Sequence, residues 1–156
     1  MLRAFADAIE WLDGAFYGVV QVDDMVIVPL KPEPPFAVSV FDHEKPGTMF
    51  DIRCALVRDV PVSKGLMDFL MNISVDNTIP EGHLILRREV REGYSGIELR
   101  YCISAALITT QHALVQLGMR MSLVVEPLAA YLHEAFGGEL ATSREAAAFQ
   151  GYGTDV

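Results

Sequence analysis

The sequence predicts an α+β domain in which helices flank a sheet built from hairpins. Helical periodicity appears in three separate stretches, and β-rich runs with alternating polarity fill the intervals between them. The predicted order is helix, three or four strands, helix, two strands and a long helix. A chain of 156 residues with 51% hydrophobic residues can bury a core as one domain. We assign residues 1–138 to this domain and residues 139–156 to a tail, in which Thr142 and Glu145 have the capping-box spacing of a short helix.

The first helix is predicted from Leu2 to Phe16, where apolar side chains step by three and four and Gly14 lies near the end. Trp11 falls away from this apolar face. It could anchor a partner, because a flat aromatic ring gains most when it is desolvated. The alternative, which is more common for large aromatic residues, is that Trp11 packs against its own chain.

Short β-rich runs follow the first helix. Residues 17–30 read either as a hairpin around Asp23 and Asp24 or as two successive strands, and the prolines of PLKPEPP then form an extended connector. FAVSVF and MFDIRCALV resume the sheet. Apolar and polar side chains alternate from Phe50 to Leu56, so we expect one dry face and one solvent-exposed face.

A second helix is predicted after Pro61, with Ser63 as its N-cap. The runs HLILRREV and SGIELRYCIS then form the clearest hairpin in the sequence. We interpret Arg87 and Arg88, facing Glu98 and Arg100, as a solvated sheet face rather than an anion site, because acidic residues lie among them.

The longest periodic segment, residues 109–136, is predicted to be the last helix. Thr109 or Thr110 can cap its start, and Gly137 with Gly138 can end it. We expect a kink or break at Pro127, which cannot donate a hydrogen bond to the carbonyl of Leu123. Its apolar face is predicted to consist of Leu114, Leu117, Met121, Val124, Leu128, Tyr131 and Ala135.

A second apolar row on the same helix, formed by Val115, Met119 and Leu123, lies roughly opposite this face. The N-terminal half of the helix is therefore apolar nearly all round. Either it is buried on both sides within one chain, or it offers these three side chains to another chain as an interface. The sequence leaves both readings open.

The charge of the chain argues against two classes of partner. Twelve Lys and Arg against 21 Asp and Glu give a formal net charge of −9, which repels nucleic acids and anionic membrane surfaces. No signal peptide opens the chain, and no uninterrupted apolar run reaches the roughly 20 residues of a membrane span. We therefore expect a cytoplasmic protein whose cysteines, Cys54 and Cys102, are reduced.

No motif in the sequence predicts catalysis. The histidines His43, His83, His112 and His133 are scattered without ligand spacing, so no metal site is predicted. The sequence contains no GxGxxG, P-loop or GxSxG motif, so we predict no cofactor and no nucleophile. We expect a protein that is not an enzyme and has no catalytic residues.

The order of elements, together with several short motifs, resembles the chaperones of type III secretion and the related YbjN family. The resemblance covers roughly Tyr17 to Gly138. It depends on VPVS before the second helix, Asn72 and Asn77 at its end, Gly82 before HLILRREV, the following IELRYCIS, and the closing helix that ends in FGG.

This resemblance implies a curved antiparallel sheet of about five strands with helices on one face, and usually a homodimer. It also implies a non-catalytic module that holds an extended client segment against apolar side chains of the first helix and the sheet. From the residues themselves we select Trp11, Phe36, Val38 and Val40 as the peptide-binding candidates. The alternative is a constitutive structural or regulatory subunit that dimerises and holds no peptide.

Overall fold

The computed structural model describes residues 1–30, 35–45, 47–76 and 82–141, and within them it confirms the predicted α+β fold. Its helices are α1 (Leu2–Ala15), α2 (Lys64–Asp76) and α3 (Gln111–Phe136), with a short 3₁₀ turn, η1 (Ala105–Leu107), before α3. The strands are β1 (Val20–Val22), β2 (Met25–Val28), β3 (Phe36–His43), β4 (Gly47–Pro61), β5 (His83–Arg88), β6 (Tyr94–Ser104) and β7 (Glu139–Leu140).

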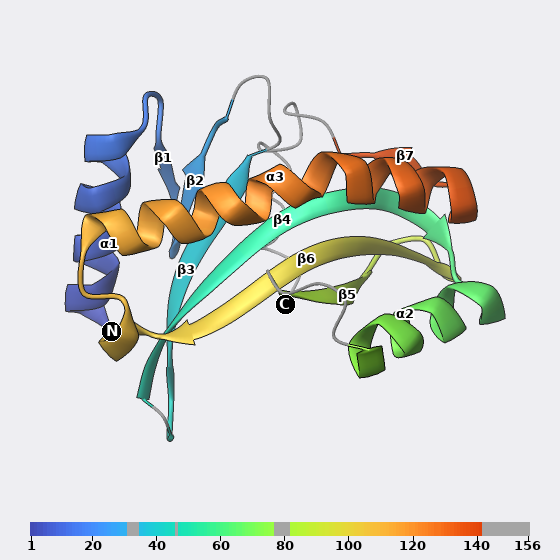
Figure 1. The fold of residues 1–156 in the computed structure, drawn as a ribbon, viewed down its shortest axis with the longest axis horizontal. Coiled ribbons are helices and arrows are strands. Elements are labelled where there is room, and N and C mark those ends of the chain that lie inside the picture. The colour runs from blue at the N-terminus through green and yellow to red at the C-terminus, as the bar shows by residue number, and fades with distance from the viewer. Residues whose placement is uncertain (31–34, 46, 77–81, 142–156) are drawn as a thin grey trace.

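The strands form one antiparallel sheet in the order β1-β2-β3-β4-β6-β5, and β7 pairs with β4. β4 is the longest strand and pairs with β3, β6 and β7. The register between β4 and β6 shifts at Val57, and such irregularities bend and twist a sheet. Figure 1 shows the resulting curvature of β4 and β6, which agrees with the predicted curved sheet. The described sheet has seven strands because it includes β1 and the two-residue β7.

The three helices pack on one face of the sheet. α3 runs along the long axis of the molecule, α1 lies near its first turns, and α2 lies near the other end of the sheet (Figure 1). Phe69 of α2 joins α2 to α3, with its ring centroid 5.5 Å from that of Tyr131 and 5.3 Å from that of Phe136. Both predicted caps form, since Ser63 Oγ accepts from the Leu66 N–H and Thr110 Oγ1 accepts from the Ala113 N–H.

The buried face of α3 differs from the predicted one. Of the predicted row, only Leu114 and Met121 are buried, and Tyr131 is 51% exposed. The helix is rotated so that small residues also face the sheet. Its buried residues are Leu114, Gly118, Met121, Ser122, Val125, Ala129 and Leu132.

Gly118 explains this rotation. A Cβ at this position would lie 2.4 Å from Cζ of Phe36, a ring that is fully buried. The absence of a side chain therefore lets the Phe36 ring of β3 lie directly against the backbone of α3. Apolar periodicity missed this contact because glycine has no side chain to count.

α3 differs from the sequence-based prediction in two further ways. The helix continues through Pro127, so the alternative of a break there was wrong. By length and composition alone α3 is also long and apolar enough to cross a membrane, which the count of uninterrupted apolar residues did not identify, and the expectation of no membrane span stays a prediction. Within this chain, 33% of its most apolar stretch is buried, and α3 covers the sheet.

The folded unit extends beyond the predicted boundary at residue 138. β7 pairs with Val57 and Arg58 of β4, and the Ala141 N–H donates to the Leu56 carbonyl. Gly138, which precedes β7, has a φ of +82°, and a Cβ there would lie 2.4 Å from the Arg58 carbonyl oxygen. The turn therefore requires glycine. The predicted short helix after Thr142 lies outside the described residues.

We predict that Gly118→Ala lowers the free energy of unfolding by about 1–3 kcal/mol, because the buried Phe36 ring has no space into which to move. Gly65→Ala in α2 is the matched control. Its new Cβ would meet nothing closer than Ser63 Oγ at 3.9 Å, so we expect no loss of stability and a gain of up to about 1 kcal/mol. Urea denaturation of both variants measures the difference, and equal stabilities would contradict the packing argument.

Candidate functional site

The candidate site lies on the outer face of the sheet, which we define as the face opposite the three helices. Alternation along each strand places Asp51 and Arg53 of β4 on this face, with Glu98 and Arg100 of β6 beside them. We predicted that the charged side chains of this face are solvated, and this prediction was wrong for the two carboxylates. Asp51 is fully buried and Glu98 is 6% exposed.

Two arginines hold the Asp51 carboxylate. Arg100 Nε donates to Asp51 Oδ1 and Arg100 Nη2 donates to Oδ2, each at 2.7 Å. Arg53 Nε donates to Oδ2 at 2.8 Å, and Arg53 Nη2 contacts the same oxygen. Burial by itself would raise the pKa of Asp51, but the hydrogen bonds from Arg100 and Arg53 outweigh it and lower the pKa below its ordinary value.

For Glu98, the effect of burial on the pKa outweighs the effect of the neighbouring positive charges. Burial raises its pKa, and the positive charges of Arg53, Arg87 and Arg100 only partly oppose this. Among the described residues, no group makes a hydrogen bond with Glu98 Oε2. Burial also lowers the pKa of Arg87 to about 10, against the attraction of Glu98 and Glu89.

We define the outer-face cluster as Asp51, Arg53, Arg87, Glu98 and Arg100. Its three guanidinium groups and two carboxyl groups give a net charge of +1 when all are ionised, and +2 when Glu98 is protonated. The whole chain carries −9. Glu89 and Arg58 also act electrostatically on Arg87, so charges of both signs lie together on this part of the sheet.

An open hollow of about 590 Å³ adjoins this cluster, lined by His83, Ile85, Arg100, Tyr101 and Cys102. Two of these residues belong to β5 and three to β6. β5 is the last strand on its side of the sheet and, in the described part of the chain, it pairs only with β6. The hollow thus lies at a sheet edge, where unpaired backbone groups can accept another strand.

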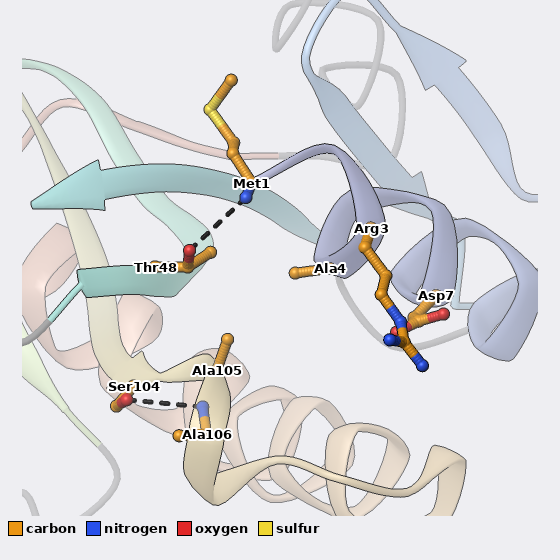
Figure 2. A pocket seen from close by; sticks show the side chains of 8 residues that line it. All are labelled: Met1, Arg3, Ala4, Asp7, Thr48, Ser104, Ala105 and Ala106. Carbon is orange, nitrogen blue, oxygen red and sulfur yellow. Dashed lines mark hydrogen bonds between the residues drawn. The ribbon is translucent and has the colours of Figure 1, made fainter.

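A second hollow, of about 350 Å³, lies beside the first turn of α1. Figure 2 shows Met1, Arg3, Ala4 and Asp7 on one side, with Thr48, Ser104 and the small side chains of Ala105 and Ala106 on the other. The Met1 amino group donates to Thr48 Oγ1 at 3.4 Å and lies 3.7 Å from a carboxylate oxygen of Asp42. This hollow includes no free strand edge, so it offers a client fewer backbone contacts than β5.

The structure corrects three of the four predicted peptide contacts. Phe36 and Val38 are fully buried and Val40 is 6% exposed, because β3 directs these side chains toward the helices. They therefore hold the core together and cannot contact a client. Trp11 is half-buried and packs against the same core, which agrees with the alternative that Trp11 packs against its own chain. Its carbonyl accepts a hydrogen bond from Gln111 Nε2 at 2.8 Å.

The predicted interface residues lie at different depths on α3. Val115 and Met119 are half-buried, and Met119 packs against the core. Leu123 is 68% exposed. The assignment of this row to a chain–chain interface stays a prediction, and only Leu123 offers most of its side chain to a partner.

The described residues contain no group of three or more His, Cys, Asp or Glu that could hold a metal ion. Burial, with a smaller effect from Glu98, raises the pKa of Cys54 to about 12. Burial and then Asp51 also raise the pKa of Cys102. Neither thiol is therefore activated as a nucleophile, because the thiolate is the reactive form.

Sequence reasoning missed Asp51 and Glu98 as candidate site residues. The available signal was the pair of motifs Asp51-x-Arg53 and Glu98-x-Arg100, each of which places an acid and an arginine on one face of a strand. The register of β4 with β6 was also needed. It sets Arg53 opposite Arg100 and Ala55 opposite Glu98.

Comparison with known proteins assigns no family to the chain. No protein-family model matches it, and no curated protein matches it. The resemblance to type III secretion chaperones and YbjN proteins therefore stays a prediction, which depends on the quoted motifs and the order of elements.

We predict opposite pH dependences for two variants of the outer-face cluster. Asp51→Asn leaves two arginines without their counter-charge, so it should lower the free energy of unfolding near pH 7 by about 3 kcal/mol. This loss is at the low end for breaking a buried ion pair, because the two guanidinium groups are partly exposed. The pKa of Asp51 is lowered in the folded state, so its stabilisation is present above the unfolded pKa of about 4 and is lost below it. The loss caused by Asp51→Asn should therefore shrink as the pH falls below 4.

Glu98→Gln is the matched comparison. The pKa of Glu98 is raised on folding, so its contribution is complete below about pH 4 and is lost as the pH rises through the folded pKa. A glutamine cannot ionise, so this variant should gain stability relative to the natural chain as the pH rises from 4 to 8. Denaturation at a series of pH values tests both variants, and parallel profiles would contradict the assignment.

Proposed function

We propose that this protein is a non-catalytic, cytoplasmic protein-binding module that holds an extended client segment by strand addition at β5. The observation that carries the proposal is the position of the 590 Å³ hollow, which adjoins β5, a strand that pairs only with β6 among the described residues. Strand addition supplies affinity through main-chain hydrogen bonds, and adjacent pockets select side chains. The net charge of −9 supports a protein partner over a nucleic acid.

The composition of β5 supports this use of its edge. Sheet edges that must stay unpaired usually carry charges, prolines or bulges. Arg87 and Arg88 place charges at the end of β5, whereas residues 83–86 carry no Lys, Arg, Asp, Glu or Pro. Ile85 and Leu86 are only half-buried, so a partner strand would cover additional apolar surface.

Exposed methionines lie on the helix that contacts this strand. α2 contacts β5, and it exposes 40% of Met67 and 64% of Met71. Methionine side chains adapt to partners of different shape because they are unbranched and flexible. They provide an apolar surface that could contribute to client binding.

We predict that Ile85→Lys weakens client binding, because a charged side chain would then lie at the edge and in the hollow. Twelve-residue segments selected for binding by phage display serve as the probe. Their affinity should fall at least about ten-fold in this variant, equivalent to about 1.4 kcal/mol. Val90→Lys is the control, since Val90 is 96% exposed beyond the end of β5.

Hydrogen exchange locates the binding site independently of the variants. A selected segment should protect backbone amides of residues 83–88, because strand addition forms new main-chain hydrogen bonds there. Protection confined to α1 and the hollow of Figure 2 would move the site away from β5. A failure to select any binding segment would count against a peptide-binding function.

The alternative is a constitutive structural or regulatory subunit that dimerises through α3 and holds no peptide. The exposure of Leu123 is the observation that favours it, because this leucine lies near the middle of α3, which runs along the long axis of the molecule. Large apolar side chains in such positions often mark an interface. Val115 and Met119 would contribute less, since both are half-buried in their own chain.

We predict for this alternative that the natural chain is a dimer and that Leu123→Asp gives a folded monomer. Leu107→Asp is the control, because Leu107 is 71% exposed on η1 and lies outside α3. Analytical ultracentrifugation measures the masses, and circular dichroism confirms that each variant is folded. A monomeric natural chain, or a Leu123→Asp variant that stays dimeric, would contradict the hypothesis of a dimer interface on α3.

A further inference from the structure

We propose that segment 142–156, which follows β7, docks on an apolar patch of the outer face of its own chain. We define the outer-face patch as a group of apolar side chains on β1, β2, β3 and β4: Val22, Met25, Ile27, Ala37 and Ala55. Three observations support the proposal: the patch is buried within one chain, no described element covers it, and β7 leads the chain toward it. The proposal does not depend on strand addition at β5.

The register of the strands places this patch on the outer face. Ile27 pairs with Ala37, and Ala37 pairs with Arg53 of the outer-face cluster. Paired residues in a sheet share a face, so the side chains of Ile27 and Ala37 point away from the helices. The core beneath the helices contains instead the residues next to them along the strands, which are Val26, Val28, Phe36 and Val38.

The patch is more deeply buried than the other end of the same face. Met25, Ile27 and Ala37 are only 7%, 4% and 1% exposed. On β5 and β6, by contrast, Ile85 is half-buried and Cys102 is exposed. The outer face of an antiparallel sheet can meet water, as it does at β5, so this difference requires a cover over β2 and β3. The exposed fractions are those of a single chain, so the cover belongs to that chain.

The described residues do not supply this cover. The helices α1, α2 and α3 lie on the other face of the sheet (Figure 1). The described apolar residues that pack against the three buried members of the patch are Val22 and Ala55, and both belong to the sheet itself. Arg53, the charged neighbour of Ala37, is directed toward Asp51 by its hydrogen bonds.

The path of the chain after β7 leads toward the patch. β7 lies on the same side of β4 as β3, because β6 pairs with the other side at Val57. The Ala141 N–H donates to the Leu56 carbonyl, so a strand continued along β4 would soon meet β3, where Ala37 pairs with Arg53. Leu56 is fully buried in the core beneath the helices. The outer face is therefore the open direction for the residues that follow.

Segment 142–156 has a length and composition that suit this surface. Its sequence contains three consecutive alanines followed by Phe149 and Tyr152, whose rings can bury a large apolar area. From β4, β2 lies two strand spacings away, about 10 Å, which about three extended residues span. Met25 begins β2, whereas the connector of residues 31–34 follows its other end, so Met25 reports on segment 142–156 rather than on the connector.

Photo-crosslinking in the full chain tests the contact directly. Phe149→p-benzoylphenylalanine and Tyr152→p-benzoylphenylalanine, made as separate variants, each replace an aromatic ring with one that inserts into nearby C–H bonds on irradiation. At least one should join β2 or β3 of the same chain, as mass spectrometry locates the product. Val90→p-benzoylphenylalanine is the control and should not, because Val90 is 96% exposed beyond β5. The absence of any product with β2 or β3 within one chain would overturn the proposal, and products only between chains would assign the surface to a second copy.

Oxidation of Met25 by hydrogen peroxide measures how often the patch is uncovered. Met71, which is 64% exposed, is the fast reference in the same sample, and the fully buried Met121 shows whether the fold is intact. We expect Met25 to oxidise more slowly than Met71 in the natural chain. Equal rates would show that the patch is open and would overturn the proposal.

Replacing both aromatic residues in the full chain by Phe149→Asp and Tyr152→Asp should release the segment. The oxidation rate of Met25 should then rise about ten-fold, toward that of Met71, because loss of a buried aromatic side chain shifts an opening equilibrium by at least this factor. Ser143→Asp with Thr154→Asp adds the same charge without removing a ring and should leave the rate unchanged. A Met25 that stays protected in the first variant would contradict docking through these rings.

Discussion

The contact between the Phe36 ring and Gly118 determines how the helices lie on the sheet. Any side chain at position 118 would overlap the buried ring, so the Phe36 ring of β3 can lie against the backbone of α3 only at a glycine. Phe36 also meets Phe16, which follows α1, at a centroid distance of 5.8 Å in an edge-on arrangement. One aromatic residue thus connects β3 with α3 and with the segment after α1.

Packing the helices on one face leaves the polar residues of β4 and β6 on the other. There a buried carboxylate is held by two arginines, an arrangement that contributes little net stability because desolvation opposes the Coulomb attraction. Removing either partner is nevertheless costly, since the remaining charge loses its counter-ion. The cluster therefore places several charged groups on the outer face while contributing little net stability.

The proposed client edge and the exposed part of α3 belong to different surfaces of the molecule. The hollow beside β5 opens among residues of the outer face, whereas Leu123 lies on a helix that covers the opposite face. Client binding and self-association would therefore not compete for the same side chains. Both rest on non-covalent contacts, and neither requires a nucleophile or a metal ion.

Local sequence signals determined the elements and their order, because helical periodicity, strand alternation and the caps at Ser63 and Thr110 depend on near neighbours in the chain. They could not determine which side of α3 is buried, since that depends on a glycine fitting against a ring about 80 residues away in the chain. They also could not find the outer-face cluster, because Asp51 and Arg100 meet only through the register of β4 with β6. Only tertiary structure decides such contacts, because burial and charge pairing depend on distances between side chains that sequence separation does not specify.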